Sequence, residues 1–91
     1  MNDNKFYVYV YFDSRKQGSF KFGEYVFNYE PFYVGKGFGR RWRKHLIEAK
    51  NYKDTNKEKC NLIREIWSQG KEPIIIKYKE NISNKEAKDF L

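Results

Sequence analysis

The N-terminal part of the chain alternates aromatic and aliphatic residues. In the segment 5–12 this period of two predicts a β-strand. One face of the strand carries the hydroxyl-bearing residues Tyr7, Tyr9 and Tyr11. The other face carries the apolar residues Phe6, Val8, Val10 and Phe12. We expect the apolar face to form the core, and the three phenols to line a half-open site because they are more polar than a core requires.

Two more strands are predicted further along the chain. The short apolar run 32–35 follows a proline, which suits the start or edge of a strand. Residues 73–80 contain three consecutive isoleucines and form the third predicted strand. Between the first two strands, the looser segment 13–31 contains two glycines, which predicts an inserted hairpin or loop.

Three helices are predicted from apolar spacing and capping patterns. Residues 40–51 place Trp42, Leu46 and Ala49 on one stripe, which predicts the first helix. The spacing of Thr55 and Glu58 is that of a capping box, so we expect the second helix to begin there and end at Gly70. Its expected buried face consists of Leu62, Ile63, Ile66 and Trp67.

A second capping box opens the third predicted helix. It consists of Ser83 and Glu86, and the helix has room for only about two turns before Leu91. Helices in globular domains average about 11–12 residues. We therefore expect one domain over residues 1–91, with its last helix cut off at the C-terminus.

Charge and cysteine content narrow the possible partners. The 91 residues carry a formal net charge of +7, which favours binding of polyanions, with nucleic acid the first candidate. The only cysteine, Cys60, excludes an internal disulfide and a cysteine-based zinc cluster, and it fits a reducing, cytoplasmic location. We expect Cys60 to act as a small buried apolar residue. No apolar run approaches the roughly 20 residues of a membrane span.

Residues 32–45 concentrate the groups that can carry chemistry. They combine a phenol, three glycines, several guanidinium groups and an imidazole, a mixture suited to binding a phosphate beside proton-transferring groups. Lys36 lies between Gly35 and Gly37, where it could hold a phosphate or depress the pKa of a tyrosine. The glycine spacing matches neither the Walker loop nor the dinucleotide fingerprint, which argues against a nucleotide cradle.

The order of these motifs resembles that of the GIY-YIG nuclease domain. The first signature corresponds to Tyr7-Val8-Tyr9 and the second to Tyr33-Val34-Gly35, while Arg41 and His45 follow on the first helix. The resemblance spans nearly the whole chain. It implies an α/β (α+β) fold with a three-stranded antiparallel sheet flanked by helices. It also implies a metal-dependent endonuclease of the kind found in homing, repair and restriction enzymes.

The resemblance assigns catalytic roles to four residues. Either Tyr9 or Tyr33 orients or deprotonates the attacking water, with nearby positive charge lowering the phenol pKa. Arg41 neutralises charge on the phosphoryl group, and His45 hydrogen-bonds a tyrosine or shuttles a proton. Tyr7 replaces Tyr9 if the register of the first signature is shifted. The structural alternatives are aromatic packing for the tyrosines, a solvated arginine and a structural histidine.

The resemblance also implies a divalent metal ion, Mg²⁺ or Mn²⁺, held by a glutamate on the third helix. Glu86 is the only glutamate there, and it also fits the capping box, so the alternative is a ligand beyond Leu91. Four basic residues are expected to bind the DNA backbone without reading its sequence, namely Lys36, Arg40, Arg43 and Lys44.

Three functions follow as hypotheses. The first is an endonuclease domain that hydrolyses DNA phosphodiesters at one active site, with sequence recognition in a separate domain absent from this chain. The second is a non-catalytic nucleic-acid-binding module with the same fold. The third is a small aromatic-rich interaction domain whose basic charge is incidental.

Overall fold

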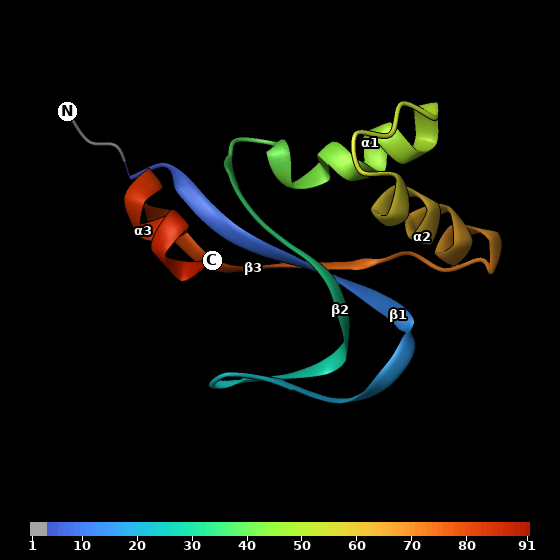
Figure 1. The fold of residues 1–91 in the computed structure, drawn as a ribbon, viewed down its shortest axis with the longest axis horizontal. Coiled ribbons are helices and arrows are strands. Elements are labelled where there is room, and N and C mark those ends of the chain that lie inside the picture. Colours follow the sequence, from blue (N-terminus) through green and yellow to red (C-terminus); the bar gives the residue numbers. More distant parts are fainter. Residues whose placement is uncertain (1–3) are drawn as a thin grey trace.

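A three-stranded antiparallel sheet organises the chain (Figure 1). The structure is a computed structural model that describes residues 4–91. Strands β1 (Phe6–Phe22), β2 (Tyr25–Phe38) and β3 (Ile74–Ile82) lie in the order β2-β1-β3, so β1 is central. The predicted α+β architecture is confirmed.

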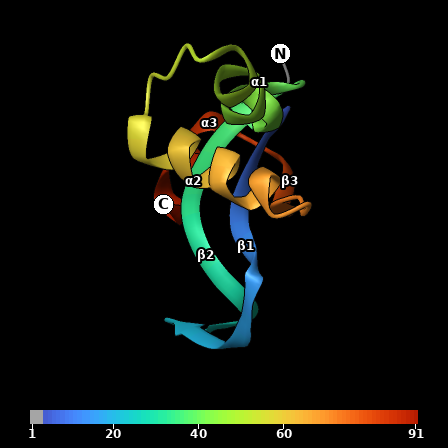
Figure 2. The ribbon, with the colours of Figure 1, turned by 90° about the vertical axis from the view of Figure 1, so that its right-hand side faces the viewer.

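Helical segments connect and cover the strands. A 3₁₀ turn (Arg41–Arg43) leads into α1 (Lys44–Asn51), and α2 (Lys57–Ser68) and α3 (Asn84–Phe90) follow. Helices α1 and α2 lie side by side, well separated from α3, which packs against β1 and β3 (Figures 1 and 2). None of these helices is long and apolar enough to cross a membrane, over the residues that the structure describes.

Both faces of β1 are buried over residues 7–13, so the expectation of a half-open tyrosine face is wrong. Tyr7, Tyr9 and Tyr11 are at most 5% exposed and belong to a core cluster with Cys60 and Ile63 of α2. The opposite face is buried as well. A central strand has neighbours on both edges, and here α1 and α2 cover the phenols, which the alternating pattern alone cannot indicate.

The segment 13–31 is the far half of one long β1–β2 hairpin rather than a separate insertion. The hairpin turns at Gly23, which has a φ of +59°, and the register shifts between Tyr11 and Phe12 and again after Asp13. These irregularities accompany a pronounced curl of the hairpin (Figure 1). The second strand is therefore much longer than the predicted 32–35, and it includes Gly35 and Gly37.

The helix boundaries differ from the predictions at two places. The first helix begins as a 3₁₀ turn, and α1 proper starts only at Lys44. Asn56, and not Thr55, caps α2 by accepting a hydrogen bond from the Lys59 amide. At α3 the predicted capping box is confirmed, because Ser83 and Glu86 each accept a hydrogen bond from the other's backbone amide.

Candidate active site

Gly35 creates the space in which two phenols meet. In the register of the hairpin, Tyr9 lies opposite Gly35, and Tyr11 lies opposite Tyr33. A Cβ atom added at Gly35 would come within 2.8 Å of both the Tyr9 hydroxyl oxygen and the Cε2 atom of Tyr33. These distances are far below normal van der Waals contact, so only glycine leaves room for the two rings at this position.

His45 joins these phenols from the first turn of α1. Its ring stands edge-on to Tyr33, with centroids 4.5 Å apart, and the Tyr9 and Tyr33 centroids are 5.9 Å apart. His45 is only 5% exposed, whereas Tyr33 is half-buried and accessible from outside. The structure thus brings together three of the four predicted catalytic side chains, and Tyr33 is the one that a substrate can reach.

The other two tyrosines of β1 serve to fix the approach to α1. The Tyr7 hydroxyl donates a hydrogen bond to the Gly39 carbonyl (2.8 Å) and accepts one from the Trp42 amide (3.0 Å). The Tyr11 hydroxyl donates to the Trp42 carbonyl. Because Tyr7 holds the backbone of the basic turn, the geometry favours Tyr9 over Tyr7 as the partner of Tyr33.

Burial changes the protonation of both Tyr9 and His45. It raises the pKa of Tyr9, and the neighbouring Tyr33 raises it further, so Tyr9 keeps its proton at neutral pH. The expectation that positive charge lowers the phenol pKa is therefore wrong for Tyr9. Burial lowers the pKa of His45 below its usual 6.5, although the carboxylate of Glu48 works in the opposite direction. His45 is consequently neutral at pH 7.

Arg41 lies beside the tyrosine group without touching it. Its stem packs on Gly37, where an added Cβ would come within 2.9 Å of the Arg41 Cβ. Its guanidinium lies over the Phe38 ring, 4.2 Å from the centroid. Gly37 and Gly35 are two positions apart on β2 and therefore face the same side of the sheet, which places Arg41 next to the phenols.

An open basic depression surrounds Arg41. It has a volume of about 470 Å³, and its cationic lining residues are Arg40, Arg41, Arg43 and Lys44. None of these four forms an ion pair with a residue in the described range 4–91. Unpaired cations gathered in one depression suit the binding of phosphate groups.

Lys36 and Glu86 lie elsewhere. Lys36 pairs with Val8 across the sheet, so its side chain leaves the face opposite the phenols, and its ammonium donates to Asn84 on α3. That position does not suit the predicted effect on a tyrosine pKa. Glu86 is exposed on the first turn of α3, where its carboxylate accepts a hydrogen bond from the Ser83 amide at 3.1 Å.

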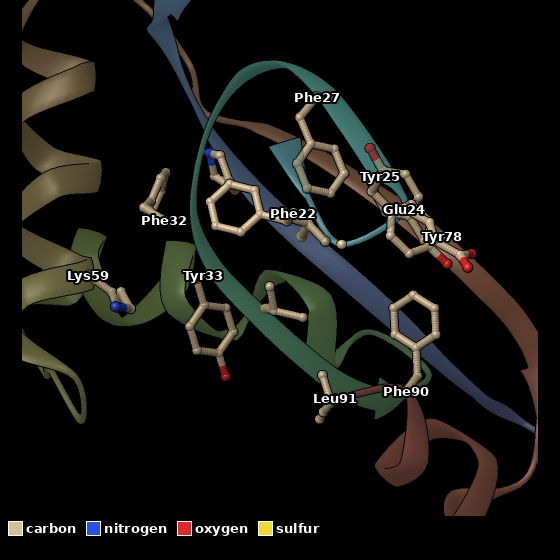
Figure 3. Close-up of a pocket in the computed structure, with 14 residues that line it drawn as sticks. Phe22, Glu24, Tyr25, Phe27, Phe32, Tyr33, Lys59, Tyr78, Phe90 and Leu91 are labelled. Atoms are coloured by element: carbon tan, nitrogen blue, oxygen red, sulfur yellow. The ribbon is translucent and has the colours of Figure 1, made fainter. Parts of the chain in front are cut away.

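The curled hairpin also forms a larger pocket that the sequence did not predict (Figure 3). Its volume is about 830 Å³, and Phe22, Tyr25 and Phe27 of the hairpin face Phe90 of α3 across it (Figure 3). Tyr33 lines the same pocket. The only signal in the sequence was the aromatic spacing of residues 20–27, which fixes neither the curl nor the contact with α3.

Strand order, the glycine-backed tyrosine pair and the adjacent basic turn together define a GIY-YIG domain, a class of nuclease domains. The family model of the LEM-3-like GIY-YIG domain matches residues 6–89, and the chain belongs to this family. No curated protein and no solved structure matches the chain.

Proposed function

We propose that this domain hydrolyses DNA phosphodiester bonds with the help of a divalent metal ion. The observation that carries the proposal is the grouping of Tyr9, Tyr33 and His45 around Gly35, next to Arg41 and its basic depression. The cationic side chains of that depression would hold the DNA backbone, while Tyr33, which lines the larger pocket and not the depression, is the phenol that the substrate can reach.

Each side chain has a distinct role in the proposed reaction. Tyr33 is the accessible phenol; after losing its own proton to solvent, its phenolate orients the attacking water and accepts the proton of that water. Tyr9 keeps its own proton and directs it towards Tyr33, which stabilises negative charge on the Tyr33 oxygen. His45 is neutral, and it would donate a hydrogen bond from its ring N–H to the oxygen of Tyr33. Arg41 stabilises the charge that develops on the phosphoryl oxygens.

The metal ion would be held by Glu86. An exposed carboxylate is the donor that Mg²⁺ or Mn²⁺ takes, and water and phosphate oxygens can complete the shell. When bound, the ion would polarise a phosphoryl group and lower the pKa of a water molecule. Glu86 lies on α3, however, and its neighbour Asn84 contacts Lys36 on the face of the sheet opposite the phenols. Binding of the ion would compete with the hydrogen bond that Glu86 accepts from the Ser83 amide.

That competing hydrogen bond favours the second candidate function, a DNA-binding module without catalysis. A carboxylate committed to capping α3 contributes little to metal binding, whereas the basic depression around Arg41 would still hold phosphates. The two functions differ in whether any bond is cut.

Nicking of supercoiled plasmid separates them. We expect Mg²⁺-dependent nicking by the wild-type domain, none in EDTA, and a loss of about 10²-fold or more in Tyr33→Phe and Arg41→Ala. The matched controls are Tyr29→Phe on the same strand and Lys71→Ala, an exposed lysine outside the depression. Salt-sensitive DNA binding without nicking would refute the nuclease and support the binding module.

A further inference from the structure

A second group of chemically reactive side chains lies between α1 and α2. His45 and Glu48 come from α1, and Cys60 comes from the facing turn of α2. The donor atoms of these three residues, one nitrogen, one oxygen and one sulfur, all lie within 4.8 Å of one another. His45 and Cys60 are buried, and Glu48 is half-buried.

The Nδ1 atom of His45 has no hydrogen-bond partner within residues 4–91, although it is completely buried. It lies 3.3 Å from the Glu48 carboxylate, which is close enough to raise the pKa of His45 but outside hydrogen-bond geometry. A buried polar atom without a partner costs about 1–3 kcal/mol, so natural proteins rarely leave one. A cation placed between the imidazole lone pair and the carboxylate would satisfy both groups.

The spacing of these donors suits a tetrahedral ion. Two ligand atoms that are each about 2.0–2.1 Å from a tetrahedral Zn²⁺ lie about 3.3–3.4 Å apart, and His45 Nδ1 and Glu48 Oε1 are already at 3.3 Å. With a Zn–S bond of about 2.3 Å, the thiolate must come within about 3.6 Å of the other donors. The distances from the Cys60 sulfur to the other two donor atoms are at most 4.8 Å, so the sulfur must move towards them by at most about 1.2 Å.

We propose that His45, Glu48 and Cys60 bind one Zn²⁺ ion. A nitrogen, a carboxylate and a thiolate form a borderline-soft donor set that selects Zn²⁺ over Mg²⁺. The Glu48 carboxylate is already oriented, because the Thr55 hydroxyl donates to both of its oxygens at 2.8 and 3.0 Å. Hydrogen-bonded ligands of this kind are typical of protein metal sites.

The ion would link α1 to α2 through its ligands and would fix the tautomer of His45. With Nδ1 bound to the metal, the ring proton stays on Nε2 and the edge-on contact with Tyr33 is held in place. This site is separate from the ion expected at Glu86, and it does not depend on nuclease activity.

Metal titration of the tag-free, EDTA-treated domain tests the proposal. Because the chain contains only one cysteine and one histidine, a site that uses both a thiolate and an imidazole can bind only one metal ion per chain. We expect one equivalent of Zn²⁺ to bind and to raise Tm by about 5–10 °C at saturation, while Mg²⁺ does neither. With Co²⁺ as the probe, we expect a thiolate-to-cobalt charge-transfer band in the near ultraviolet.

Substitutions assign the ligands. Cys60→Ala should abolish the cobalt band and weaken Zn²⁺ binding at least tenfold, and Glu48→Gln should weaken it about tenfold. The control Glu58→Gln removes an exposed carboxylate on α2 and should change neither. Absence of the cobalt band from the wild-type domain overturns the proposal, even if the Cys60 variant fails to fold. Zn²⁺ affinity that is unchanged in Glu48→Gln and in a folded Cys60→Ala also overturns it.

Discussion

The substitution Gly35→Ala tests the packing on which the tyrosine pair depends. The new methyl group would lie 2.8 Å from the Tyr9 hydroxyl oxygen, from the Tyr9 Cζ and from the Tyr33 Cε2. Ordinary contacts begin near 3.4 Å, so one or both rings must move by about 0.6 Å or more. The Tyr9 ring is buried between the sheet and the helices and has little room to move.

The expected cost follows from the crowding. Inserting one methylene-sized group into a packed core typically costs about 1–3 kcal/mol. We therefore expect the free energy of unfolding of Gly35→Ala to fall by about 1–3 kcal/mol. Displaced phenols should also lower plasmid nicking by about tenfold to a hundredfold, measured where the variant is still folded.

Urea denaturation followed by tyrosine and tryptophan fluorescence measures the stability. The control is Gly18→Ala in the far half of the hairpin, where the added Cβ would meet only the ring of Phe20 at 3.1 Å. It should cost less than the Gly35 substitution and leave nicking unchanged. A Gly35→Ala variant as stable and as active as the wild type would refute this account of the site.

Three further predictions concern charge. Asp13 is buried and accepts hydrogen bonds from the Arg15 guanidinium at 2.9 and 2.7 Å, which lower the pKa of Asp13. We expect Asp13→Asn to reduce the free energy of unfolding, measured by urea denaturation, by about 1–3 kcal/mol. A loss below about 0.5 kcal/mol would contradict this prediction. Burial lowers the pKa of His45, so below about pH 6.5 the unfolded chain binds more protons than the folded one. The free energy of unfolding should therefore fall as the pH drops below about 6.5. An equally steep decline in His45→Gln would show that His45 is not the group responsible. In the double variant Arg43→Ala/Lys44→Ala, the slope of log affinity for duplex DNA against log salt concentration should decrease in magnitude by about two, as measured by fluorescence anisotropy. An unchanged slope would mean that these two residues do not contact DNA phosphates.

Local chemistry made much of the fold predictable. The capping box of Ser83 and Glu86 satisfies amides that the start of any helix leaves unpaired, so it marks α3 without knowledge of the rest. The apolar stripe of α2 likewise predicted its buried face, and Ile63 and Ile66 are fully buried. Signals of this kind involve residues that are close in sequence.

The misplaced features depend on long-range packing. The predicted strand 32–35 ended at Gly35 because glycine weakens strands, yet Gly35 and Gly37 both lie within β2, where phenol and arginine side chains need the space of a missing Cβ. The burial of Tyr9 depends on helices that follow much later in the chain. The contact between α1 and α2 at Cys60 also joins residues far apart in sequence, and no local pattern marks it.

The rate of DNA cleavage by Tyr33→Phe, measured together with its DNA affinity, tests the central claim most directly. The substitution removes one hydroxyl oxygen and retains the ring that packs on His45. We predict a single-turnover cleavage rate lower by about 10²-fold or more, with a Kd for the same DNA within about twofold of wild type. Cleavage at the wild-type rate would contradict the assignment of Tyr33 as the catalytic phenol.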